Sequence, residues 1–171
     1  MEVSTGARVT VRLARIIDAE AIRSIYNREV TGSTVTFDLV PRTIDDQQQW
    51  LAAHSGAHPA VVAVDSDDTS VTGFASLTPY RSRPADSTTV EDSVYVHADH
   101  RGRGIGGVLL AEIVELAVAS GFHAIMDRVV GTHEASIALH RACGFELVGV
   151  EREVGRKFGQ WLDVALMQRL L

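Results

Sequence analysis

The stretch TVEDSVYVHADHRGRGIGG, residues 89–107, contains the features that decide the fold of this chain. Its β-branched first part, residues 89–96, predicts a strand, and its second part holds four glycines among residues 102–107. From Ile105 onward, apolar residues recur at helical spacing, so the glycine-rich turn should lie between a strand and a helix. Unpaired N–H groups at a helix N-terminus favour an anion, and glycine lets a phosphate approach the backbone closely. The stretch therefore predicts a phosphate-binding turn, with a flexible loop as the alternative.

Outside this stretch, apolar patterns predict further strands and helices on both sides. Two apolar runs, 60–64 and 71–75, are separated by a polar turn at 65–70 and predict an antiparallel hairpin. Strands are also expected at 9–13, 124–130, 145–154 and 161–170, and helices after Asp18, after Thr43, from Ile105 to an end at Gly121, and at 134–143. This order predicts an α/β domain with a mixed sheet and helices on its faces.

Length and composition favour a single globular domain over residues 1–171. Of the 171 residues, 46% are hydrophobic and 22% are charged, so neither disorder nor a fibrous class is indicated. The formal net charge of −6, without a long basic block, argues against nucleic acid as a partner. No apolar run has the roughly 20 residues that cross a bilayer, and the first residues lack a basic, apolar leader. We therefore expect a cytoplasmic protein without a membrane partner, and the lone Cys143 agrees with a reducing compartment.

The glycine pattern is compatible with a second kind of phosphate site. Gly102, Gly104 and Gly107 satisfy G-x-G-x-x-G, and Asp127 stands 20 residues after Gly107, as in a dinucleotide-binding fold. That fold places its turn almost directly after the first strand of a long parallel sheet. Here residues 97–101 intervene, a hairpin comes before, and only 64 residues follow Gly107. An NAD-binding protein is therefore retained only as an alternative.

The pattern Arg-x-x-Gly-x-Gly at Arg101, Gly104 and Gly106, after a strand, resembles the acetyl-CoA loop of the GNAT superfamily of N-acetyltransferases. The resemblance implies a GNAT-type fold, with a mixed, mostly antiparallel central sheet of about seven strands and helices on both faces. It also implies that amides of the turn hold the coenzyme pyrophosphate, while the strand pairs with pantetheine and presents an N–H to the thioester carbonyl. The implied coenzyme-binding residues are Val94, Tyr95, Val96, Arg101, Gly102, Arg103, Gly104, Ile105, Gly106, Gly107 and His133.

Further segments are similar to the phosphinothricin and methionine sulfoximine acetyltransferase branch of that superfamily. They occur along nearly the whole chain, at residues 25–27, 33–37, 89–96, 136–140 and 155–161. Members of this branch acetylate the α-amine of small amino-acid analogues and commonly form homodimers. The resemblance thus implies a small amino-acid-like amine as substrate, acetyl-CoA as cosubstrate, direct attack on the thioester, and a homodimer.

Two residues are candidates for catalysis. An amine with a pKa of about 8 to about 10 is largely protonated near neutral pH, so a base has to remove a proton before attack. Glu91, on the strand before the turn, matches the family's presumed general base, with a solvated strand carboxylate as the alternative. His140 occupies the position from which relatives donate a proton to the departing thiolate, with a packed helix residue as an equal alternative.

The carboxylate of an amino-acid substrate needs a cationic partner. Arg81 and Arg83 come shortly before the predicted strand and are candidates for a bidentate contact with that carboxylate. Phe37 and Tyr80 are expected to line the substrate pocket. These four residues are therefore the predicted substrate-binding set.

Two positions depart from the pattern of this branch. Asp86 stands where an aromatic residue is usual, and His133 stands where an asparagine contacts the coenzyme. An aspartate in the pocket wall could admit a different amine or repel a second carboxylate. The departures bear on which amine is used more than on the chemistry.

No metal site is predicted. The histidines of His97-x-x-His100 and the pair His133 and His140 lack a third ligand at a suitable spacing. A different functional class stays open, namely a CoA- or nucleotide-binding module that retains the turn and performs no chemistry. Glu91 and His140 favour an enzyme, since a pure binding module requires neither.

Overall fold

The computed structural model describes residues 9–66, 69–131 and 133–171. Residues 1–8, where the sequence predicts no leader, and residues 67–68 of the predicted polar turn lie outside this part. The strands are β1 (Val9–Leu13), β2 (Ala60–Asp65), β3 (Val71–Pro79), β4 (Thr89–Val96), β5 (Ala124–Val130), β6 (Glu146–Lys157) and β7 (Gln160–Leu170). The α-helices are α1 (Ala19–Gly32), α2 (Ile44–Ala53), α3 (Ile105–Ala119) and α4 (Glu134–Ala142). None of these helices is both long enough and apolar enough to cross a bilayer.

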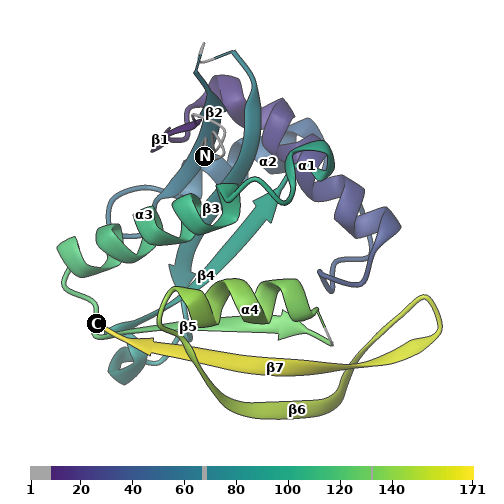
Figure 1. Cartoon of the computed structure of the whole chain (residues 1–171), viewed down its shortest axis with the longest axis vertical. Coiled ribbons are helices and arrows are strands. Elements are labelled where there is room, and N and C mark those ends of the chain that lie inside the picture. Colours follow the sequence, from purple (N-terminus) through teal and green to yellow (C-terminus); the bar gives the residue numbers. More distant parts are fainter. Residues whose placement is uncertain (1–8, 67–68, 132) are drawn as a thin grey trace, which may run out of the picture.

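The described strands form one sheet in the order β1-β2-β3-β4-β5-β7-β6 (Figure 1). Neighbouring strands are antiparallel except for β4 and β5, which run parallel. Their pairing begins with Thr89 and Ala124 and ends with Glu91 and Met126, after which the strands diverge, as Figure 1 shows. The predicted mixed, mostly antiparallel sheet is thus confirmed, and one parallel pair does not supply the long parallel sheet of a dinucleotide-binding fold.

Alternation along β4 separates the two faces of the sheet. Val90 belongs to a buried cluster with Leu109 and Ile113 of α3, against which α4 also packs. Tyr95 packs against a second cluster that contains Tyr26 of α1 and is covered in part by α2. Helices therefore lie on both faces, as predicted, and residues one apart on β4 face opposite helix layers.

The predicted starts of the first two helices are confirmed, with one difference in capping. Thr43 precedes α2, and its hydroxyl accepts a hydrogen bond from the amide of Asp46 in a capping box. Asp18 precedes α1 but makes no side-chain cap to that helix. Its carboxylate instead pairs with Arg12 at 2.8 Å and accepts the amide N–H of Arg15 at 2.7 Å. The carboxylate of Asp18 therefore ties the start of α1 to β1 instead of capping the helix.

Candidate active site

The divergence of β4 and β5 opens a cleft of about 700 Å³ between the two strands. It is lined by residues 91–96 of β4 and 127–130 of β5, together with the glycine-rich turn, the first turn of α3, part of α4 and the segment after α1. Because parallel pairing ends at Glu91 and Met126, the strand edges beyond this point face the cleft instead of each other. A splayed parallel pair thus creates the site.

The main chain of β4 presents hydrogen-bond donors to this cleft. The amide of His97 donates to the carbonyl of Thr72 at 2.8 Å, and the register between β3 and β4 is regular. Since alternate residues of a strand bond to the same neighbour, the odd-numbered residues of β4 bond to β3. The N–H groups of Val94 and Val96 therefore point to the cleft edge, while the Val96 carbonyl accepts from Arg101 Nε at 3.3 Å. These donors are suited to a polar group of a ligand lying along the strand.

The glycine-rich turn forms an open cradle at the N-terminus of α3. Gly102 and Gly104 have φ angles of +75° and +80°, which favour glycine, and Gly104 is the N-cap residue. The bond from the Val108 amide to the Gly104 carbonyl opens the helix, so the amides of residues 105–107 lack a helical acceptor. A Cβ atom placed on Gly102 or Gly104 would meet no described heavy atom within 4 Å. The cradle therefore fits a diphosphate, which the positive end of the helix would attract.

The charged residues near the cradle have different roles. Arg101 lines the cleft, but its guanidinium forms an ion pair with Glu29 of α1. Arg103 is exposed and does not line the cleft. His133 does line it, and burial together with the charge of Arg101 lowers the pKa of its imidazole. All the predicted coenzyme-binding residues except Arg103 therefore border the cleft.

Glu91 lies where the cleft begins, on the same face of β4 as Tyr95 and α1. Burial raises the pKa of the Glu91 carboxyl, the charge of Arg128 on β5 opposes this rise, and Asp92 and Glu151 add to it, so the net shift is upward. Arg128 itself forms an ion pair with Glu151 at 2.6 Å. A carboxylate with a raised pKa at the border of a cleft is a better proton acceptor than an exposed one.

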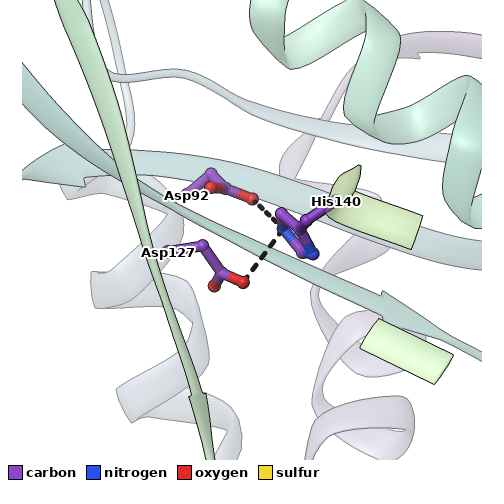
Figure 2. A group of neighbouring side chains, drawn as sticks. All are labelled: Asp92, Asp127 and His140. Atoms are coloured by element: carbon purple, nitrogen blue, oxygen red, sulfur yellow. Dashed lines mark hydrogen bonds and ion pairs between the residues drawn. The ribbon is translucent and has the colours of Figure 1, made fainter. Parts of the chain in front are cut away.

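His140 of α4 lies between two aspartates that come from the two diverging strands (Figure 2). Its Nε2 is 3.1 Å from Oδ2 of Asp92 and 3.1 Å from Oδ2 of Asp127. Its Nδ1 is 2.8 Å from the backbone carbonyl of Ser136, which can only accept a hydrogen bond. The three side chains are almost fully buried, and Nε2 forms its hydrogen bond with Asp92, whereas Oδ2 of Asp127 has no hydrogen-bond partner among the described residues. A ring with an acceptor at each nitrogen favours the doubly protonated imidazolium.

The electrostatics of this triad agree with its geometry. Burial alone would lower the pKa of His140, but the hydrogen bond to Asp92 and the charges of both aspartates outweigh it and raise this pKa to about 9. Burial and the charge of Asp92 raise the pKa of Asp127 to about 7, although the imidazolium opposes the rise. Burial raises the pKa of Asp92 as well. These pKa values mean that His140 is mostly protonated near neutral pH and that Asp127 is partly protonated.

The structure brings one of the predicted substrate-binding residues to the cleft. Phe37 lines it, whereas Tyr80, Arg81 and Arg83 do not. The guanidinium of Arg81 lies 4.7 Å from the centre of the Tyr80 ring, and Arg81, Arg83 and Asp86 border a separate depression. The physical reason is position: these residues join β3 to the start of β4, where β4 and β5 are still paired. Asp86 is therefore not in the wall of the cleft.

Several residues of the cleft were missed by sequence reasoning. Glu29, Asp92, Asp127 and Arg128 all line it, and the sequence had singled out only Asp127, for its spacing from Gly107 in the NAD-binding alternative. A signal was present for two of them, because Asp127 and Arg128 are charged residues in the middle of an otherwise apolar strand. Charged residues inside a buried strand indicate a functional or paired site.

Comparison with known proteins adds independent information. The model of the acetyltransferase (GNAT) family matches residues 19–145. Phosphinothricin N-acetyltransferase of Streptomyces coelicolor is 38% identical over 167 residues, which cover 96% of this chain and 98% of that protein. L-methionine sulfoximine/L-methionine sulfone acetyltransferase of Pseudomonas aeruginosa is 38% identical over 160 residues, with coverage of 93% and 92%. A crystal structure of a GNAT superfamily phosphinothricin acetyltransferase from Sinorhizobium meliloti in complex with AcCoA has a TM-score of 0.91 and 39% identity, covering 95% of this chain and 88% of that one.

Proposed function

This chain belongs to the acetyltransferase (GNAT) family, and on that premise we propose that it acetylates the α-amine of a small amino acid or amino-acid analogue. The chain is an N-acetyltransferase that uses acetyl-CoA. The amine class is supported by the substrates in the names of its relatives, phosphinothricin and methionine sulfoximine. The observation that carries the proposal is a single cleft with a glycine cradle at one side and Glu91 where it begins.

The cleft holds the coenzyme through main-chain donors. Acetyl-CoA supplies an activated acetyl group whose carbonyl gains negative charge during attack by an amine. The amides of residues 105–107 would hold the diphosphate, and His133 and Arg101 border the same space. The N–H groups of Val94 and Val96 would stabilise the developing negative charge on the carbonyl oxygen.

Glu91 would act as the general base. An α-ammonium group with a pKa of about 8 has to lose a proton before its nitrogen can attack. Because the pKa of Glu91 is raised, it lies closer to the pKa of the ammonium group. This favours proton transfer from the ammonium group to the carboxylate, directly or through a water molecule. The amine then attacks the thioester directly, without a covalent enzyme intermediate.

His140 would supply the proton that the departing thiolate needs. Support comes from the two aspartates beside its ring, which raise its pKa to about 9, and from its position at the cleft border. The neighbouring Cys143 is not assigned a catalytic role, because burial raises the pKa of its thiol and so disfavours the thiolate.

For the substrate carboxylate, the assignment of Arg81 and Arg83 with Tyr80 stays a prediction, which rests on the charge of the two arginines and on their position shortly before β4. Phe37 would line the amine site, since it belongs to the segment after α1 that borders the cleft. Arg81→Gln should raise the KM of an amino acid several-fold and leave that of its decarboxylated amine unchanged. Equal effects on both substrates would remove Arg81 from the site.

A homodimer is the proposed assembly. Strand β6 is at one edge of the sheet, and several large apolar side chains of the hairpin formed by β6 and β7 are exposed. Exposed apolar side chains gathered on one edge indicate a partner surface. They are Leu147, Val148, Val150, Val154, Phe158 and Trp161. Sedimentation equilibrium should give twice the chain mass for the natural protein and the single mass for Val150→Asp; a monomeric natural protein would refute the assembly.

A cytoplasmic location is proposed as well. It is supported by a single cysteine and by a coenzyme that is abundant inside cells. Cell fractionation with detection of the chain in the cytoplasmic fraction tests the location, and recovery from a secreted fraction would contradict it.

The function is tested by a turnover screen that follows thiol release from acetyl-CoA. The panel pairs each amino acid or analogue, including phosphinothricin and methionine sulfoximine, with its decarboxylated amine. We expect turnover on amino-acid substrates and little on their decarboxylated partners. Binding of acetyl-CoA without turnover on any amine would favour a binding module, and preference for the decarboxylated amines would overturn the substrate class.

The coenzyme cradle is tested at Gly104. A valine there has to adopt a left-handed φ, which costs about 1–2 kcal/mol, and its side chain enters the space in front of the amides. Gly104→Val should weaken acetyl-CoA binding by about ten-fold or more in calorimetry, whereas Gly121→Val, at a similar φ but at the far end of α3, should cost stability alone. Unchanged affinity in Gly104→Val would mean that the coenzyme binds elsewhere.

A further inference from the structure

The ring of His140 has no nitrogen left for the cleft. Nδ1 donates to the Ser136 carbonyl at 2.8 Å, and Nε2 forms its hydrogen bond with Oδ2 of Asp92 at 3.1 Å. Oδ2 of Asp127 also lies 3.1 Å from Nε2 and, among the described residues, has no hydrogen-bond partner of its own. Direct donation from His140 to a group in the cleft would break one of these contacts. A proton held by this ring therefore leaves more easily through a neighbouring carboxylate.

The two aspartates differ in their access to the cleft. The side chain of Asp92 has 0% exposed surface and that of His140 has 2%, whereas that of Asp127 has 10%. Asp92 and His140 also border the cleft, but Asp127 is the member of the triad with the most exposed side-chain surface. It also lies on β5 opposite the β4 edge that presents main-chain donors to the same space.

We propose that Asp127 is the proton-transfer residue of the triad, carrying a proton from Nε2 of His140 to the departing thiolate in the cleft. This inference rests on the proposed function. Asp127 in its protonated form gives up its O–H proton, an S–H bond forms, and the carboxylate takes a new proton from Nε2–H. His140 recovers its proton from water. The ammonium substrate loses two protons in becoming an amide, so one balances the thiol and one leaves to solvent.

The groups around Asp127 favour this role. Asp92 and Glu91 on β4 disfavour its ionised form, and His140 on α4 favours it. From β7, the partner of Asp127 in the register is Met167, which is buried in the apolar cluster below α3 and α4. Among the described residues, the charges that act on Asp127 thus come from one cation and two anions, and burial together with the anions raises its pKa to about 7, so its proton can move near neutral pH.

The first test uses the free protein, so that it does not depend on turnover. Nitrogen-15 NMR of labelled histidine should show His140 protonated on both ring nitrogens at about pH 7.5. In Asp127→Asn the pKa of His140 should fall, because one of its two anionic partners is lost. A neutral His140 ring in the natural protein, or a titration unchanged by Asp127→Asn, would overturn the proposal.

The second test separates proton transfer from structural support. Asp127→Asn should lower kcat by about ten-fold or more and remove the fall of kcat at high pH, with the dissociation constant of acetyl-CoA unchanged. Asp92→Asn is the matched control, since Asp92 is equally close to Nε2 but has no exposed side-chain surface, and it should lose less. Asp127→Glu should recover part of kcat. Equal losses in the two asparagine variants would mean that Asp127 only positions the ring.

Two other outcomes are decisive. One oxygen of each aspartate and one ring nitrogen of His140 lie within 4.8 Å of one another, which is close enough to hold a metal ion. Elemental analysis of the purified protein therefore tests for a metal. A divalent metal at one equivalent per chain would overturn the proton assignment. Failure of the natural enzyme to acetylate any amine would instead refute the proposed function. The NMR titration would still show whether His140 is protonated and whether Asp127 affects its pKa.

Discussion

Glu91 and Asp92 are neighbours on β4, yet their carboxylates lie in different surroundings. Glu91 faces the α1 side at the start of the cleft, and the cation that acts on it, Arg128, is already paired with Glu151. Asp92 faces α4, has no exposed side-chain surface and contacts His140. The difference arises because successive side chains of a strand point to opposite faces.

The role of a carboxylate in the cleft therefore depends on which helix layer covers it. On the α1 side, a carboxylate without a cation of its own is free to accept a proton. On the α4 side, burial and an imidazolium hold two carboxylates in a fixed network that retains protons. Strand β4 thus supplies a proton acceptor, Glu91, to one face of the sheet and supplies Asp92, a partner of the protonated His140, to the other.

The largest expected effect comes from removing the acceptor. Glu91→Gln should lower kcat by about 100- to 1000-fold without weakening acetyl-CoA binding, because a general base contributes about 10²–10⁴-fold. Steady-state kinetics and calorimetry measure the two quantities. Glu151→Gln is the matched control, because it removes a carboxylate close to Arg128 that does not line the cleft. Turnover of Glu91→Gln equal to that of the natural enzyme at every pH would end its role as base.

The α4 side should dominate the pH dependence of stability. The folded pKa of His140 is about 9 against an ordinary 6.5, so its stabilisation is complete below about pH 6.5 and is lost as pH rises through about 9. The free energy of unfolding should then fall by up to about 1.4 kcal/mol per pH unit in that range. Urea unfolding above about pH 7.5 avoids the range in which Asp127 titrates. Parallel curves for the natural protein and His140→Gln would contradict the buried imidazolium.

Glu91→Gln, which should lower kcat strongly, should at the same time slightly stabilise the fold. Because its folded pKa is raised, Glu91 stabilises the fold only when protonated, and this contribution is lost as pH rises above 4.5. At neutral pH, Glu91→Gln removes a disfavoured charge and should therefore raise the free energy of unfolding. Urea unfolding measures the change, and a clear loss of stability would show that the carboxylate is well paired.

The smallest effect should appear in the pH profile. The charge of Arg128 opposes the rise in the pKa of Glu91, so Arg128→Gln should move the acidic limb of kcat/KM to higher pH. Arg128→Lys keeps the charge and should leave the limb near its original place. A limb that does not move in Arg128→Gln would mean that another group titrates there.

The sequence predicted most of the fold for local reasons. The β-branched run of β4, the glycines after it and the apolar spacing of α3 specify a strand, a turn and a helix without reference to other elements. Glu91 and the cradle could be found because they belong to this one local stretch. Asp92 and Asp127 were not assigned their roles because they are 35 residues apart and meet only through the sheet.

By itself, the sequence determined the order of elements, the phosphate-binding turn and the family to which the chain is similar, since these depend on short-range pattern. Tertiary structure decided that β4 and β5 separate after three residue pairs and that Arg101 forms an ion pair with Glu29. It also decided that Arg81 and Arg83 lie away from the cleft. It also placed His140 between two aspartates. The physical reason is that strand divergence and burial are properties of the packed sheet, and they fix which polar groups meet and how tightly each holds its proton.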